Sequence, residues 1–259
     1  MTSSRTDLLR PGSAGALAVW AAARDAGRCS ADDVLSTLGE YAQVHEYAPG
    51  GGTLELLSAV SRAAHLVVRL PAPGDPQGLP PGRATDAAMA VGEVLVVDDR
   101  PAPADGPAAG LALIPRGSGE RCRWEAIRYS TPVAVDALSV DEPLGEIEYR
   151  LRGAIGDAAN LLSGLGGGRR TAPAEVREAV GDVARRRRID LPPHDDPRVD
   201  RVLASADRVE AIVVLAGRGT LGDSGGELAA ADTALRELAE LSRRARAAAL
   251  NAVIVGYRR

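Results

Sequence analysis

Apolar residues recur at helical spacing throughout the second half of this 259-residue chain. Between Ile147 and Leu165 they step by three or four residues, which lays one apolar stripe along a helix. The same spacing returns in the segments 199–213 and 228–241. Because each stripe has to be buried against another element, residues 141–259 are predicted to form a set of packed amphipathic helices.

Start and stop signals place the ends of these helices. Pro143 suits a first helical turn, and Gly166–Gly168 interrupts the helix that follows it. Asp196 precedes a proline, and an aspartate cap followed by proline is a strong start signal because the carboxylate accepts from free backbone N–H groups. Ser224 and Glu227 have the spacing of a capping box, which predicts that Ser224 caps a further helix.

Helical and strand patterns alternate in the first 140 residues. Two helices are expected near the start, one over 13–26 and one that opens at Ser30 and runs to Pro49. Several turns in the region that follows are too short for helical crossovers, so its strands should pair mostly antiparallel. The expected short strands are 65–70, 93–97, 111–114 and 121–129, with 131–135 as a further candidate.

These patterns predict an α+β fold with an N-terminal helical hairpin, a small mostly antiparallel sheet and a C-terminal helical bundle. Apolar residues make up 45% and charged residues 25% of the chain, a balance that favours a folded protein over a disordered one. We expect a mixed helix/sheet region over 1–140 and a helical region over 141–259 packed on it, as one compact domain or as two associated subdomains.

The charge balance argues against nucleic-acid binding. All 31 basic residues are arginines, and 35 acidic residues outnumber them, whereas a nucleic-acid binder usually carries a basic footprint. The basic run Arg185–Arg188 falls at the end of a predicted helix, where cations offset the negative end of the helix dipole. Docking of this run to nucleic acid or to an acidic protein is kept as an alternative.

Cysteine usage and hydropathy bear on the location of the protein. Cys29 and Cys122 are too few for a disulfide framework and lack metal-ligand spacing, so two buried thiols in a reducing compartment are expected. No apolar run approaches the roughly 20 residues that span a bilayer. The expected location is cytoplasmic, without membrane association.

One short motif points to hydrolytic chemistry. The segment Gly222–Gly226 resembles the surroundings of the nucleophilic serine in chymotrypsin-like proteases, and the residues before His65 resemble the surroundings of that family's base. The resemblance implies Ser224 as nucleophile, His65 as base and Asp99 as the group that orients the base. It covers about ten residues, and Glu227 stands where that family usually has proline.

A structural interpretation explains the same residues. Ser224 opens a predicted helix, and the segment before it is mostly helical, whereas chymotrypsin-like proteases are built from β-barrels. His45 and His65 lie on apolar faces, where hydrogen-bonded core histidines are the commoner outcome. No metal-ligand spacing or cofactor motif stands out, so we assign no catalytic residue, no metal and no cofactor.

Three segments are candidate binding sites. The glycine clusters 50–52 and 164–168 follow helices and lack the ending of a nucleotide-binding loop, although Arg169 and Arg170 beside the second cluster could pair with an anion. The proline-rich loop 69–83, with Asp75 and Arg83, is the third candidate, because long ordered loops often bind ligands.

The nearly unbroken apolar run Ala247–Val255 near the end of the chain is either buried on all sides or meets a partner. The first outcome is favoured, and a homodimer through this helix is the alternative. We therefore expect a protein that acts by binding or self-association. The alternative is a small-molecule enzyme whose site is assembled from distant residues, for instance near the loop 69–83.

Overall fold

The computed structural model describes residues 9–48, 50–61, 63–101, 106–138, 142–164, 173–218 and 225–258. The chain forms two compact units, and each is described here by itself. The first, the sheet unit, comprises Met1–Asp141, Ile189–Asp195 and Leu250–Arg259; the second, the helical unit, comprises Glu142–Arg188 and Asp196–Ala249. The sequence predicted a single boundary near residue 140, with every later residue in the helical region. In the structure, Ile189–Asp195 and Leu250–Arg259 belong to the sheet unit.

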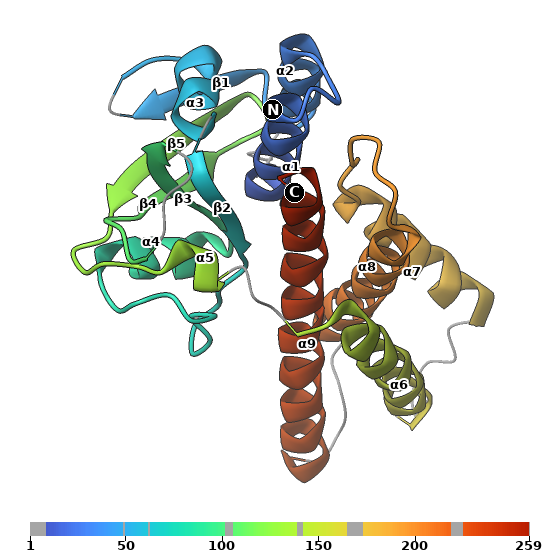
Figure 1. Ribbon diagram of the computed structural model, residues 1–259. Coiled ribbons are helices and arrows are strands. Elements are labelled where there is room, and N and C mark those ends of the chain that lie inside the picture. The colour runs from blue at the N-terminus through green and yellow to red at the C-terminus, as the bar shows by residue number, and fades with distance from the viewer. Residues whose placement is uncertain are drawn as a thin grey trace, which may run out of the picture. The chain divides into compact units, whose positions relative to one another are not determined.

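The sheet unit is built on a mixed sheet with the strand order β1-β5-β4-β3-β2 (Figure 1). Its strands are β1 (Val44–Ala48), β2 (Ala63–Arg69), β3 (Val94–Pro101), β4 (Leu111–Gly117) and β5 (Arg121–Arg128). Strand β1 runs parallel to β5, and the other described pairs are antiparallel. The prediction of a small, mostly antiparallel sheet is therefore confirmed.

Helices cover both faces of this sheet. On one face, α4 (Arg83–Val91) and α5 (Val135–Leu138) close a core over alternate strand residues such as Val67, Val96 and Ile114. Helices α1 (Ser13–Asp25) and α3 (Thr53–Val60) contact the strands, and α2 (Ala31–Gly39) packs on α1. The pair α1 and α2 is the expected N-terminal helical hairpin.

Helix α1 begins at a cap that another part of the chain supplies. Gly12 precedes the helix with φ +105° and has no side chain to accept from the first amides. The buried carboxylate of Glu93, just before β3, accepts from the backbone N–H groups of Gly12 and Ala14, each at 3.1 Å. A carboxylate at the positive end of the helix dipole stabilises α1 and ties it to the sheet.

One helix predicted from the sequence is shorter than expected. Its start is confirmed, because Ser30 and Asp33 form a reciprocal capping box. However, α2 ends at Gly39, and His45 lies in strand β1 instead of on the same helix. The predicted strand over 131–135 is also absent from the described residues, where Val133 forms one isolated bridge with Ala108.

The outer edge of β2 is covered by side chains. The amide of Asn251 accepts from the backbone N–H of Val68 at 2.8 Å and donates to its carbonyl at 3.2 Å. The Arg258 guanidinium donates to the carbonyls of Ala63 and Ala64 at 2.6 and 2.9 Å. These contacts pair backbone groups that an edge strand otherwise presents to other chains.

From Leu250 onward, the apolar run near the end of the chain packs within the sheet unit. Leu250, Val253 and Ile254 are all buried. A Cβ atom on Gly15 of α1 would lie 2.8 Å from Leu250 Cδ1, so a larger residue there would force the buried Leu250 side chain to move. The favoured prediction, burial within the chain, agrees with this packing, and self-association through this helix stays a prediction.

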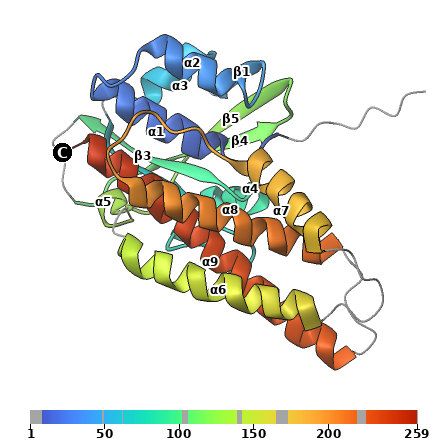
Figure 2. The same cartoon turned by 90° about the vertical axis from the view of Figure 1, so that its right-hand side faces the viewer.

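The helical unit contains α6 (Leu144–Gly164), α7 (Pro173–Arg187), α8 (Pro197–Arg218) and α9 (Gly225–Tyr257) up to Ala249. Helices α6 and α7 both pack along α8 (Figure 2), and the predicted stripes are buried at Ile147, Leu151 and Val202. Asp196 caps α8 by accepting from the N–H of Arg198 at 2.9 Å. The prediction of a C-terminal helical region is confirmed.

A buried ion cluster joins three helices of this unit. Arg246 of α9, which is 5% exposed, donates to the Arg187 carbonyl at 2.9 Å, to the Glu210 carboxylate at 3.0 Å and to the carboxylate of Asp207. Arg187 pairs with Glu210 in turn. Burial raises the pKa of Asp207, because removing a carboxylate charge from water is unfavourable.

Candidate functional site

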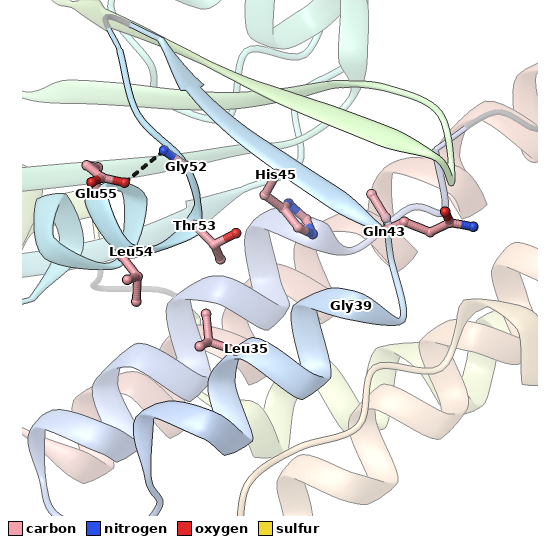
Figure 3. A pocket seen from close by; sticks show the side chains of 9 residues that line it. Leu35, Gly39, Gln43, His45, Gly52, Thr53, Leu54 and Glu55 are labelled. Atoms are coloured by element: carbon pink, nitrogen blue, oxygen red, sulfur yellow. Dashed lines mark hydrogen bonds between the residues drawn. The ribbon is translucent and has the colours of Figure 1, made fainter.

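An open pocket of about 480 Å³ lies in the sheet unit between the end of α2, the start of β1 and the first turn of α3 (Figure 3). Its apolar lining comes from Leu35, Ala42 and Leu54, and Figure 3 shows the Leu35 and Leu54 side chains extending toward each other from α2 and α3. The remaining lining residues are Gly39, Gln43, His45, Gly52, Thr53 and Glu55. Leu54 is 62% exposed, and it is one of three large apolar side chains that the described residues expose.

The glycine cluster 50–52 brings α3 beside this pocket. Gly51, at φ +129°, accepts from the backbone N–H of Tyr47 at 2.9 Å, so the chain returns along β1. A Cβ atom on Gly51 would lie 2.6 Å from Glu55 Cγ, which excludes any side chain. These glycines therefore serve a tight return of the chain, and the phosphate-binding alternative has no support from their geometry.

Glu55 occupies part of the α3 N-terminus. Its carboxylate accepts from the backbone N–H of Gly52 at 2.8 Å, and this hydrogen bond lowers the pKa of Glu55. Among the described residues, no acceptor pairs with the backbone N–H groups of Thr53 and Leu54. The pocket thus combines apolar walls, two free backbone donors and a carboxylate that stays ionised.

His45, which is 4% exposed, also lines the pocket but has both ring nitrogens engaged. The indole N–H of Trp124 donates to His45 Nδ1 at 2.9 Å, and an indole nitrogen can only donate. Nδ1 is therefore the acceptor, and Nε2 carries the proton that it donates to the Leu38 carbonyl at 2.8 Å. As expected from the sequence, His45 is a hydrogen-bonded core histidine.

The burial of His45 predicts a pH-dependent stability. Burial lowers the pKa of His45 below its ordinary value of 6.5. The unfolded chain then binds the proton first, so this contribution to stability is complete above pH 6.5 and is lost as the pH falls below it. We expect the midpoint of urea unfolding, followed by tryptophan fluorescence, to decrease between pH 7.5 and pH 5.5.

A His45→Gln variant, which has no titrating ring, should be less stable at pH 7.5 but show a flatter profile across this interval. A profile as steep as that of the unsubstituted protein would mean that another group controls the pH dependence. In ¹⁵N NMR spectra, Nδ1 of His45 should give the shift of an unprotonated ring nitrogen at pH 7.5.

The residues of the hydrolytic hypothesis have other roles where the structure describes them. His65 lies opposite Asp98 in the β2–β3 register, and neighbouring Asp99 is on the other face of the sheet. Asp98 binds the Arg100 guanidinium, with Nη2 to Oδ2 at 2.7 Å, and this contact lowers the pKa of Asp98. Asp99 pairs instead with Arg128. The structure therefore does not place Asp99 where it could orient His65.

Other predicted site residues are only partly described. Ser224, Arg169 and Arg170 lie outside the described residues. Asp75 sits in a tight turn where its Oδ1 accepts from the backbone N–H of Gln77 at 3.3 Å. Arg83 donates to Glu125 at 3.4 Å. The predicted binding roles of these residues stay predictions.

The loop 69–83 contributes to the core of the sheet unit. Its residue Leu79 is 4% exposed and packs in the cluster under α4 and α5. Gln77, at φ +52°, accepts from the Leu70 N–H at 2.9 Å through its side-chain oxygen. Packing and hydrogen bonds account for the order of this loop, so we place the candidate site at the pocket instead.

Neither cysteine has the character of an activated nucleophile. Both are free thiols, and Cys122 is buried. Burial raises the pKa of the Cys122 thiol to about 12 and, to a smaller extent, that of half-buried Cys29. The described residues contain no group of three or more side chains placed to hold a metal ion. Within the same segments, no helix combines the length and the hydropathy that crossing a bilayer needs.

The pocket was not found from the sequence. Its lining residues come from α2, β1, the link between them and the start of α3, and the helix predicted through Pro49 had merged α2 with β1, so the shape of the pocket was hidden. The available signals were the glycine run 50–52 and Leu54, an apolar residue in the first turn of a short helix. Neither signal alone distinguishes a pocket from a loop.

Comparisons with known proteins all point to one family, and they do not identify an activity. Residues 14–141 match the family model described as Rv1486c-like protein, N-terminal domain, and residues 145–247 match that of the C-terminal domain. The chain is 31% identical to Uncharacterized protein Rv1486c of Mycobacterium tuberculosis, with 92% of this chain and 96% of that protein covered.

Two further relatives come from other mycobacteria. Uncharacterized protein ML1804 of Mycobacterium leprae is 29% identical with the same coverage, and Uncharacterized protein MAV321 of Mycobacterium avium is 33% identical over 63% of this chain and 56% of its own length. No solved structure matches the chain significantly. With both of its regions matched and a full-length relative above 30% identity, the chain belongs to the Rv1486c-like protein family.

Proposed function

We propose that the protein is a cytoplasmic binding protein whose pocket between α2, β1 and α3 receives an apolar group of its ligand. The supporting observation is the pocket itself: its volume of about 480 Å³ and its mixture of apolar walls with a few polar groups are typical of ligand sites. The exposure of Leu54 beside it gives the ligand an apolar surface to cover.

Binding is favoured over catalysis by the state of the polar groups in the pocket. His45 uses both ring nitrogens within the fold, and the Glu55 carboxylate is held ionised by the Gly52 N–H. Neither group is poised to exchange a proton with a substrate near neutral pH. The N–H groups of Thr53 and Leu54 can instead donate to a ligand oxygen.

Acetyl-leucinamide tests this proposal, because it carries one apolar side chain and two carbonyl oxygens without charge. In ¹H–¹⁵N NMR titrations we expect saturable shifts of the Thr53 and Leu54 amides with millimolar affinity, as the size of the probe allows. Leu54→Asp should remove these shifts, because it places a charge on the apolar wall.

The matched control is Tyr149→Asp, which changes another exposed apolar residue on α6, in the helical unit. It should leave the titration unchanged. Shifts that spread over both units without saturation, or that persist in Leu54→Asp, would contradict a ligand site at this pocket.

A further inference from the structure

The surroundings of the pocket are acidic. Glu55 lines the pocket, Glu40 follows the lining residue Gly39, and Asp32 lies one helical turn before Leu35 on the same face of α2. The described residues that line the pocket include no arginine. An occupant with a positive charge would therefore find acceptors on two sides of the apolar wall.

Most of this negative charge is not neutralised within the described residues. No described cation forms an ion pair with Asp32 or Glu55. Glu40 is paired with Arg10 at 3.6 Å, and its side chain is still 52% exposed. Among the described side chains, the unpaired negative charge beside the pocket is therefore that of Asp32 and Glu55.

The helix dipole of α3 does not reverse this sign. A free helix N-terminus attracts anions, but here the Glu55 carboxylate already accepts from Gly52 at that end. What is left for a ligand is the pair of N–H donors at Thr53 and Leu54, which a neutral carbonyl oxygen satisfies. A carboxylate or phosphate ligand would be repelled by Asp32 and Glu55.

A ligand that satisfies all three features carries an apolar side chain, carbonyl oxygens and flanking cations. We propose that the pocket docks a basic, leucine-containing peptide segment of a partner protein, with leucine against Leu35 and Leu54 and arginine or lysine toward Asp32 and Glu55. This inference rests on the proposed function and gives the partner its chemistry. Complementary charge adds specificity and a salt-dependent rate of association.

Three peptides of equal length test the charge of the occupant: Ac-Arg-Leu-Ala-Leu-Arg-NH₂, its Gln counterpart and its Glu counterpart. Binding is followed by ¹H–¹⁵N NMR with the whole protein at low and high salt. We expect the basic peptide to bind about tenfold more tightly than the neutral one and the acidic peptide to bind weakest, because exposed pairs in water each contribute little. The difference should shrink as salt screens the charges.

The double variant Asp32→Asn/Glu55→Gln should bring the basic peptide to the affinity of the neutral one. Glu55→Gln keeps an oxygen that can accept from Gly52. The control Asp232→Asn/Glu240→Gln removes two exposed charges from α9 in the helical unit and should preserve the preference.

The outcomes separate this inference from the proposed function. If acetyl-leucinamide binds but the three peptides bind equally, or the acidic one binds best, the basic partner is overturned and the pocket stands. If neither acetyl-leucinamide nor any peptide shifts the pocket amides, both proposals fail. Binding of acidic lipid vesicles at the same residues would also overturn the inference, because it would show that negative charge is accepted there.

Discussion

Replacing Arg246 by methionine is expected to lower the free energy of unfolding of the helical unit by about 3–5 kcal/mol. The guanidinium is the centre of the buried cluster and contacts Asp207, Glu210 and the Arg187 carbonyl. Methionine fills similar volume but leaves the buried Asp207 carboxylate without its cation. The uncompensated charge of Asp207 then lowers the free energy of unfolding by more than the ion pair had contributed to it.

Two spectroscopic signals assign the effect to one unit. Trp20 and Trp124 both lie in the sheet unit, so tryptophan fluorescence follows that unit, whereas far-ultraviolet circular dichroism also follows the helices. In urea, the Arg246→Met variant should unfold its helices at lower denaturant than the unsubstituted protein.

Removing the Asp207 charge at the same time should restore much of this loss. In the variant Arg246→Met/Asp207→Leu the buried carboxylate is gone, and apolar packing replaces the ion pair. If the single and the double variant were equally destabilised, the loss would come from packing and not from an uncompensated charge. A single variant as stable as the original would contradict the burial of the cluster.

Asn251→Leu is expected to destabilise the sheet unit by about 2–4 kcal/mol. The amide of Asn251 is 1% exposed and pairs with both the N–H and the carbonyl of Val68. Leucine has a similar size but no polar atoms, so two buried backbone groups lose their partners at about 1–3 kcal/mol each. Urea unfolding followed by tryptophan fluorescence measures the change.

Gly256→Ala is the control on the same helix. In the described part of the chain, no atom outside the helix's own backbone and the neighbouring residues lies within 4 Å of the Cβ position, and alanine is favoured over glycine in a helix by about 1 kcal/mol. This variant should be as stable as the original protein or slightly more stable. If Asn251→Leu changed stability by less than about 0.5 kcal/mol, the two hydrogen bonds would not be formed in the folded protein.

Local signals predicted much of the fold. Apolar spacing identified α6 and α8, and the caps at Ser30 and Asp196 gave two helix starts correctly. Strand β1 was missed for two reasons. Its pairing partner β5 begins at Arg121, far along the chain. In addition, the apolar spacing of a five-residue segment that follows a helix fits a continuation of that helix equally well. The final apolar stretch is the end of α9, which is one helix of 33 residues.

The candidate site could not be derived by the same means. The orientation of His45 depends on Trp124, which is 79 residues away in sequence, and no motif links them. The pocket walls converge only because Gly51 lets the chain return along β1. The sequence motif around Ser224, by contrast, is evident from the sequence, but Ser224 lies outside the described residues.

The side chains that cover β2 have a consequence for how the molecule is made. Asn251 and Arg258 follow the helical unit in the chain, so they leave the ribosome only after that whole unit has been synthesised. During this interval the backbone groups of Val68 and of Ala63 and Ala64 lack these partners and can template intermolecular strand pairing. Productive folding of the nascent protein therefore depends on keeping the outer edge of β2 away from other chains until residue 258 has been synthesised.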